Sequence, residues 1–172
     1  MADITEAVPT GVVSDGNGRV VFVKTLADPS KPKVTELSST TAGAVVPLTY
    51  SITGDGYSHS VTINKVTANR LTLPTQIQYD GTEVDDLSIT YAYTNTEGDK
   101  VRLALPKGTT GYVVERWAIP NGTEWAAAQI VTVIQITAST SLPNAPVTNQ
   151  ELTRTQALNV SGKVWRDVAV VA

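Results

Sequence analysis

The 172-residue chain contains no cysteine and only one histidine. Without cysteine there can be no disulfide, thiolate metal ligand or cysteine nucleophile, and one histidine leaves carboxylates as the main metal ligands on offer. Charged residues make up 17% of the chain, whereas about a quarter is typical. The net charge is −3, and no run of Lys or Arg could hold phosphates. The composition therefore excludes a disulfide scaffold, a thiolate metal site and a basic nucleic-acid interface.

The sequence also lacks long apolar segments. No stretch approaches the ~20 apolar residues of a transmembrane helix. Residues 1–11 have neither the basic region nor the apolar region of a signal peptide. We therefore expect a protein with no membrane association that is made and folded in a cytoplasm.

What the chain does have is alternation of apolar and polar residues. Abundant Thr, Ser and Val favour strands over helices. In residues 87–94 one strand face would carry Leu87, Ile89, Tyr91 and Tyr93, and the other would carry Ser88, Thr90, Ala92 and Thr94. Gly111–Ile119 alternates too, but neither face is polar, so we expect the core on one side and a neighbouring chain on the other. The pattern predicts an all-β, antiparallel β-sandwich or partial barrel of about eight to eleven short strands, with long arms and at most one short helix.

The sequence predicts a single domain over residues 1–172, with two irregular arms. Residues 1–18 form an N-terminal arm, and Ala138–Gln150 forms an extended, uncharged arm. Compact domains seldom contain a structureless loop of this length unless it has a role. The remaining local predictions are a return strand at Lys33–Leu37, turns at Gly54–Gly56 and Asp80-Gly81, a strand at Val101–Leu105 paired with 87–94, and two final strands divided by Ser161-Gly162.

Few residues could carry catalysis. Asp55, Ser58 and His59 supply the atom types of a hydrolytic triad, but three members so close in sequence rarely reach the geometry. A solvated turn histidine is the favoured interpretation. The acidic residues at 83–86 could bind a hard cation through oxygens, although a solvated strand end is favoured. No pair of carboxylates stands out for glycoside hydrolysis. We expect no enzymatic activity and no cofactor or metal.

Residues 101–172 carry a family resemblance. In order they contain VRLAL, KGTTGYVVERWAIP, EWAAAQ and the ending LNVSGKVWRDVAVVA. This series resembles the major tail proteins, or tail tube proteins, of long-tailed bacteriophages, most of all those that infect actinobacteria. The first hundred residues match that family mainly in size and strand content.

The resemblance implies a structural virion protein whose β-sandwich subunits form hexameric rings. The rings would stack into a hollow tail tube through which DNA is ejected into the host. About four strands of each subunit would complete one inner β-barrel shared by the ring. The implied partners are further copies of the chain and the tape measure, tail terminator and distal tail proteins. DNA would pass through without specific binding.

A lumen of this kind should be neutral or acidic, because a basic one would hold DNA by releasing counterions. Six copies at −3 each give 6 × −3 = −18 per ring. We therefore expect some of the following acidic residues to face the lumen: Asp80, Glu83, Asp85, Asp86, Glu97 and Asp99.

Ring stacking needs protruding segments, for which residues 1–18, 27–33 and 138–150 are the candidates. Tryptophan is a typical interface anchor, although each of the three is equally expected in the core. The candidate subunit or ring contacts are Trp117, Trp125, Leu142, Pro143, Pro146, Val147 and Trp165.

Three other functions stay open on the sequence. Exposed, coplanar aromatic side chains would favour a carbohydrate-binding or adhesin-type β-sandwich. A pocket that joins His59 to distant carboxylates would favour an enzyme. The third alternative is another virion part, such as a capsid decoration or tail terminator protein.

Overall fold

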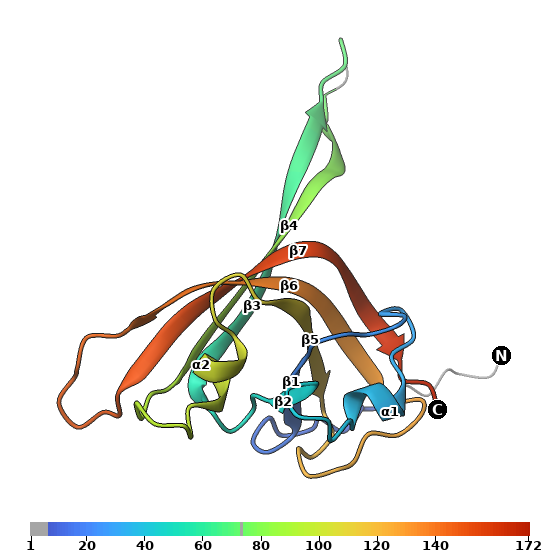
Figure 1. Ribbon diagram of the computed structural model, residues 1–172. Helices are drawn as coiled ribbons and strands as arrows, with labels where there is room; N and C mark the ends of the chain where they lie inside the picture. Colours follow the sequence, from blue (N-terminus) through green and yellow to red (C-terminus); the bar gives the residue numbers. More distant parts are fainter. Residues whose placement is uncertain (1–6, 73) are drawn as a thin grey trace.

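The computed structural model describes residues 7–72 and 74–172. Seven strands form one antiparallel sheet, in the order β2-β1-β5-β6-β7-β4-β3. The sheet is open and curls on itself (Figure 1), so that side chains of edge strand β3 reach those of β5 although three strands separate them in the sheet. The predicted all-β, antiparallel class is confirmed.

Four of the strands are long, and two of them leave the body of the subunit. The ends of β3 and β4 project as a two-stranded hairpin (Figure 1), which we call the projecting hairpin and define as Val61–Ala68 with Ile77–Val84. The elements in chain order are β1 (Gly18–Val23), α1 (Val34–Leu37), β2 (Val45–Pro47), β3 (Ile52–Ala68), β4 (Ile77–Ala92), α2 (Lys100–Ala104), β5 (Thr110–Trp117), β6 (Ile130–Pro143) and β7 (Thr153–Ala169).

The sheet buries apolar side chains on both faces. Inside the curl lies an inner core of Val20, Phe22, Leu48, Leu87, Ile89, Tyr91, Val101, Leu105, Val113, Ile134, Ile136, Ala138 and Leu158. On the other face lies an outer core of Val21, Val23, Leu26, Leu37, Val114, Trp125, Val131, Val133 and Val170. Each buried Val, Leu or Ile contributes roughly 1.5–3 kcal/mol of hydrophobic stabilisation.

The two cores explain why Gly111–Ile119 has no polar face. Val113 enters the inner core, and its neighbour Val114 enters the outer core. The expectation that a neighbouring chain covers the second face is wrong at Val114. Leu26 and Leu37 of the same chain cover it, because the loop after β1 and helix α1 fold across the sheet.

Two short helices are present where at most one was predicted. Val101–Leu105 was predicted to be a strand, but α2 occupies it. Val101 and Leu105 lie four residues apart on one helical face and both enter the inner core, whereas Leu103 is exposed. The apolar residues at 101, 103 and 105 look like strand alternation, but the two that are buried, Val101 and Leu105, have the i, i+4 spacing of a helix.

Lys33–Leu37 also differs from its predicted return strand, because α1 begins at Val34. The Glu36 carboxylate accepts hydrogen bonds from the backbone amides of Lys33 (3.0 Å) and Ala27 (2.9 Å). A glutamate at this position satisfies amides that the first helical turn leaves unpaired. Strand β1 pairs instead with β2, further along the chain.

Three predicted glycine breaks lie inside continuous strands. Around Gly56 and Gly81 the pairing of β3 with β4 shifts register, as in a β-bulge, and β7 runs through Gly162 in the same way. At Gly81 a Cβ would lie 2.5 Å from the backbone oxygen of Asn64. These glycines therefore permit close approach within bulged strands and do not mark turns.

The arms are shorter than predicted. Strand β6 extends to Pro143, so only residues 144–150 of the predicted arm lie outside strands. The Asn144 side-chain amide donates to the Thr153 hydroxyl at 2.9 Å, which holds the loop to the start of β7. In the N-terminal arm, residues 7–17 contain neither helix nor strand, and residues 1–6 lie outside the described residues.

Candidate functional site

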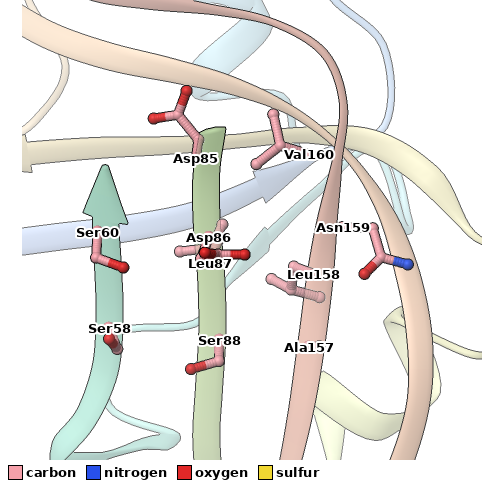
Figure 2. A pocket seen from close by; sticks show the side chains of 10 residues that line it. All are labelled: Ser58, Ser60, Asp85, Asp86, Leu87, Ser88, Ala157, Leu158, Asn159 and Val160. Carbon is pink, nitrogen blue, oxygen red and sulfur yellow. The ribbon is translucent and has the colours of Figure 1, made fainter. Parts of the chain in front are cut away.

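One side of β3, β4, β6 and β7 carries small polar side chains. Leu87 and Ile89 of β4 enter the inner core, so Asp86, Ser88 and Thr90 point away from it. The hydroxyls of Thr90 and Thr155 lie 2.9 Å apart across the β4–β7 pair. Strand pairing assigns nine residues to this surface, part of which is seen in Figure 2. We call it the polar face: Ser58, Ser60, Asp86, Ser88, Thr90, Thr137, Thr155, Ala157 and Asn159.

The polar face is hydrophilic but nearly uncharged. Asp86 is its one ionisable residue, and none of its nine members is Lys or Arg. A shallow pocket of about 340 Å³ lies over Ser58, Ser88 and Ala157. Hydroxyl and amide groups bind water, but without cations they cannot hold a polyanion by releasing its counterions. The chemistry of this surface is that of a wetted, weakly acidic wall.

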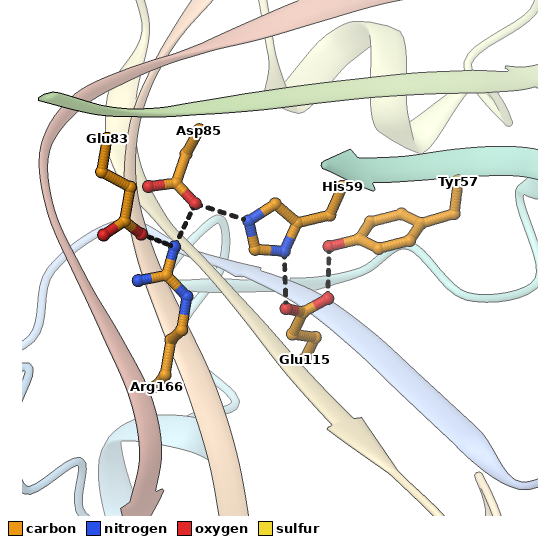
Figure 3. A network of polar contacts seen from close by, with 6 residues as sticks. All are labelled: Tyr57, His59, Glu83, Asp85, Glu115 and Arg166. Atoms are coloured by element: carbon orange, nitrogen blue, oxygen red, sulfur yellow. Dashed lines mark hydrogen bonds and ion pairs between the residues drawn. The ribbon is translucent and has the colours of Figure 1, made fainter. Parts of the chain in front are cut away.

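A second group of polar side chains lies inside the curl, where the projecting hairpin leaves the body (Figure 3). Glu115 of β5 accepts a hydrogen bond from the Tyr57 hydroxyl (2.8 Å) and lies 3.0 Å from His59 Nδ1. His59 Nε2 lies 3.2 Å from Asp85. Arg166 of β7 contacts Asp85 and, at 2.7 Å, Glu83. We call these six residues the root network: Tyr57, His59, Glu83, Asp85, Glu115 and Arg166.

The centre of the root network is shielded from solvent. The side chains of His59, Asp85 and Glu115 are 13%, 11% and 6% exposed. Burial, together with the charge of Glu115 and the hydrogen bond to it, raises the pKa of Tyr57 well above its ordinary value, so the phenol stays a donor. The two ring nitrogens of His59 thus lie against carboxylates of two different strands, Glu115 of β5 and Asp85 of β4.

The structure corrects the interpretation of His59. It is not a solvated turn residue, because it lies in β3 between two carboxylates. It does not form a triad with Ser58, which points to the polar face. Asp55 accepts instead from the Thr53 hydroxyl at 3.2 Å. Sequence reasoning missed the partner Glu115, since only the curl of the sheet brings β3 to β5.

The six acidic residues predicted for a lumen occupy different places. Asp86 lies on the polar face, Glu83 and Asp85 in the root network, Asp80 on the projecting hairpin, and Glu97 and Asp99 in the loop before α2. Glu83 and Asp85 contact Arg166, whereas Asp86 faces the other side of β4, so the acidic residues at 83–86 do not converge. Among the described residues no three His, Asp or Glu side chains are grouped as metal ligands.

Asp99 is committed to its own loop. Its carboxylate accepts from the Thr94 amide (2.8 Å), the Thr94 hydroxyl (2.6 Å) and Arg102 Nε (3.2 Å). Burial acts to raise the pKa of Asp99, but the hydrogen bonds from Thr94 and Arg102 outweigh it and lower the pKa below its ordinary value. Because Asp99 is buried in this way, we do not assign it to a lumen.

The predicted contact residues divide into a core residue and surface residues. Trp125 is 6% exposed, and the guanidinium groups of Arg19 and Arg116 lie 5.1 and 4.7 Å from its ring centre. It therefore serves the outer core of its own subunit. Trp165 is half-buried, and Trp117 is exposed beside Tyr57. The others, Leu142, Pro143, Pro146 and Val147, are exposed at the end of β6 and in the loop after it.

Sequence reasoning missed the projecting hairpin, because Asp80-Gly81 is a typical hairpin-turn dipeptide and predicts a turn at a place where β4 continues. Its strands pair Lys65 with Asp80, Val66 with Tyr79, Thr67 with Gln78 and Ala68 with Ile77. One face is therefore apolar, formed by Val66, Ala68, Ile77 and Tyr79, and the other is polar. The signal was present as matching alternation on both sides of residues 69–76. Val66 and Tyr79 are exposed, and clustered exposed apolar side chains mark a surface that a partner covers.

Comparison with known proteins completes the description of these surfaces. A family model described as "Phage tail tube protein" matches residues 5–172. The match includes the first hundred residues, which the resemblance in residues 101–172 left weakly supported. No curated protein matches the chain. No helix among the described residues has the length and apolar character needed to cross a membrane. The actinobacterial host implied by the resemblance stays a prediction.

Proposed function

We propose, because this chain belongs to the phage tail tube protein family, that its copies form stacked hexameric rings whose bore conducts DNA during ejection. Family membership makes the chain a structural component of a phage tail that assembles with itself and with other tail proteins. Beyond family membership, we propose the sixfold ring symmetry, the passage of DNA through the bore, and contacts with tape measure, tail terminator and distal tail proteins. The role is structural and non-catalytic.

The observation that carries the proposal is the unclosed sheet. Strand β3 is an edge of 17 residues without proline, and in the described part of the chain it pairs on one side only. Strand β2, at the opposite edge, is three residues long and ends in Pro47, which protects it from further pairing. A long, unprotected edge is stabilised when another chain pairs with it.

A second open edge lies on β6. Its pairing with β5 ends at Thr137, so among the described strands Ser141–Pro143 pair only with β7, and Pro143, which has no N–H, limits further pairing to the residues before it. The strands β6, β7, β4 and β3 alternate in direction, so β3 of one copy and β6 of the next would run antiparallel. Repetition of this four-strand unit would close an antiparallel barrel without free edges.

The polar face would line the bore of that barrel. The opposite face of the same strands is filled by the inner core, which leaves the polar face for the solvent side. About 24 strands at ~4.8 Å spacing and ~40° tilt give a backbone diameter near 48 Å and, after side chains, a bore of roughly 38 Å. Asp86 is the lumen acid that this arrangement favours, while Asp80 and Glu97 stay candidates. Glu83 and Asp85 face Arg166 inside the curl.

The projecting hairpin would contact a second copy through its apolar face. The exposed candidates Trp117, Leu142, Pro143, Pro146 and Val147 and the half-buried Trp165 would make further subunit or ring contacts. The double variant V66S/Y79S tests whether the hairpin makes this contact, because it replaces two apolar side chains with serine and changes only the apolar face. The matched control, K65S/Q78S, changes the polar face of the same strand pair.

The test combines size-exclusion chromatography with negative-stain microscopy at rising protein concentration. We expect rings or tubes from the wild-type chain and from K65S/Q78S, and folded subunits with few tubes from V66S/Y79S. A protein that stays monomeric at high concentration, with no filaments in the micrographs, would overturn the proposed function. Equal tube yields from the two double variants would show that the apolar face of the hairpin is not needed for assembly. The proposed pairing of open sheet edges would not be affected by that result.

The alternative functions have less support. Trp117 and Tyr57 are tilted by 57° to each other, which is unlike the coplanar platform expected of a carbohydrate-binding surface. His59 does contact two carboxylates that are distant in sequence, Glu115 and Asp85. Both of its ring nitrogens are engaged by these contacts and do not face a pocket in the described part of the chain. The pocket that reaches Asp85 opens at the polar face, and His59 is not among its lining residues. Neither observation favours a sugar-binding or hydrolytic role.

A further inference from the structure

The projecting hairpin leaves the sheet at a definite point. Strand β4 pairs with β7 from Ser88 to Ala92, and among the described strands its residues 77–87 pair with β3 alone. A two-stranded ribbon without a third strand or a packed face is marginally stable in water. Its direction relative to the body must therefore be set by side-chain contacts at its base.

The root network lies at that base and ties both strands to the body. On the β4 side, Arg166 of β7 contacts Asp85 and Glu83, which share one strand face two residues apart. On the β3 side, Tyr57 and His59 both reach Glu115 of β5. The contact of His59 with Asp85 joins the two anchors (Figure 3). At the base of the hairpin, β3 and β4 are thus each held by a different strand of the body, and Glu83 is the residue of the hairpin itself that takes part.

Arg166 occupies the critical position in this network. Its contact with Glu83 is the outermost ion pair between the hairpin and the body among the described residues. One guanidinium nitrogen, Nη2, contacts both carboxylates, so a single cation of β7 holds two successive residues on the same face of β4. Without Arg166, the like charges of Glu83 and Asp85 would face each other on one strand face, and Asp85 would keep only its contact with His59 among the described contacts.

We propose that the root network is a clamp that fixes the direction in which the projecting hairpin leaves the subunit, with Arg166 as its positioning residue. The consequence for assembly rests on the proposed function, in which the hairpin contacts a second copy. A hairpin held in one direction meets the next copy with its apolar face already placed. A loose hairpin pays a larger entropic cost on each contact.

The experiment compares Arg166→Gln with the matched control Lys163→Gln in the full-length chain. Lys163 is a cation on the same strand, but its contact is with the ring of Trp165 and not with a carboxylate. Hydrogen exchange with mass spectrometry is measured at a concentration where the protein is monomeric. We expect residues 61–84 of R166Q to exchange about fivefold faster while β1 and β5 keep their protection, and K163Q to match the wild type.

Tube formation by the same preparations is then followed by light scattering and microscopy. We expect R166Q to assemble more slowly and into less regular tubes than K163Q, with Arg166→Lys intermediate. Unchanged exchange at 61–84 in R166Q overturns the clamp. Faster exchange in R166Q together with normal tubes would overturn the role of the clamp in assembly. The proposed tube-forming function would still hold.

Two further outcomes separate the clamp from other failures. If R166Q loses protection throughout the chain, Glu83→Gln decides, because it removes the outer contact and leaves Arg166 paired with Asp85. Unchanged exchange in a folded E83Q then counts against the clamp, and faster exchange confined to the hairpin supports it. If wild-type protein forms no tubes, the proposed function fails, and the exchange measurement still reports on the clamp.

Discussion

At the scale of single residues, Arg116 shows how a buried charge can be structural. Its guanidinium donates to the backbone carbonyls of Pro120 (3.0 Å) and Thr123 (2.9 Å) and to the Gln129 side chain (2.9 Å). Burial lowers the pKa of Arg116, and nearby Arg19 adds repulsion in the same direction. The residue therefore organises the turn after β5, a role that its place in an alternating strand does not reveal.

Arg116→Met tests this role. We expect it to lower the free energy of unfolding by about 3 kcal/mol, because the turn carbonyls lose their buried donors. Arg19→Met should cost about 1 kcal/mol or less, since Arg19 makes one such bond, to Thr123 at 3.2 Å. Urea denaturation followed by tryptophan fluorescence measures both, and equal losses would contradict the assignment.

Asp99 gives a prediction with a pH dependence. Its pKa is lowered in the folded state, so its stabilisation is complete above the pKa of an unfolded aspartate, about 3.9, and is lost as the pH falls through the folded pKa. Asp99→Asn should therefore lower the unfolding free energy by about 1–2 kcal/mol at neutral pH and by progressively less in acid. Glu97→Gln is the control, because Glu97 is exposed in the same loop. A gap between wild type and D99N that is independent of pH would contradict this account.

At the scale of elements, the sequence predicted strands better than it predicted their limits. The alternation at 87–94 correctly placed Leu87 and Ile89 in a core, because that pattern reports burial directly. The glycine signals predicted turns where β3, β4 and β7 continue. A glycine shows only that a side chain would not fit, and the space at Gly56 or Gly81 is taken by the neighbouring strand. That information resides in the pairing and not in the local sequence.

Gly56 and Gly54 provide a matched test within one irregular stretch of β3. A Cβ at Gly56 would lie 2.3 Å from the backbone oxygen of Thr90, whereas a Cβ at Gly54 would meet nothing within 4 Å. Gly56→Ala should lower the unfolding free energy by about 2 kcal/mol, because β4 must move away. Gly54→Ala should change it by less than about 0.5 kcal/mol. Thermal or urea unfolding of the two variants decides, and equal stabilities would show that this part of the sheet yields easily.

At the scale of the whole molecule, the surfaces proposed for assembly were the least predictable from sequence. The resemblance in residues 101–172 led to the family, but it did not locate the hairpin or the polar face. Ser58 and His59 are adjacent in sequence and serve opposite faces, and the partners of His59 become neighbours only when the sheet curls. Surfaces that are completed by other copies leave no packing pattern within one chain.

Asp86→Lys tests the assignment of the polar face to the bore. In the proposed hexameric rings this change places six lysines around the bore, so assembled tubes should retain duplex DNA at least about tenfold more than wild-type tubes do, with retention falling as salt rises. Glu151→Lys makes the same charge change in the exposed loop before β7 and should retain no more DNA than wild type. Cosedimentation of tubes with DNA at several salt concentrations measures this. If D86K and E151K retain DNA equally, the polar face does not line the bore.

The alternation along β4 also determines where the chain can grow longer over evolutionary time. One residue inserted between Glu83 and Leu87 would exchange the sides on which Asp85 and Asp86 emerge, damaging the buried and the wetted surfaces together. The loop at residues 144–150 carries no such constraint. Natural variants that differ in length should therefore avoid the middle of β4, whereas a change of length at residues 144–150 would alter the proposed contacts of Pro146 and Val147 and leave the sheet intact.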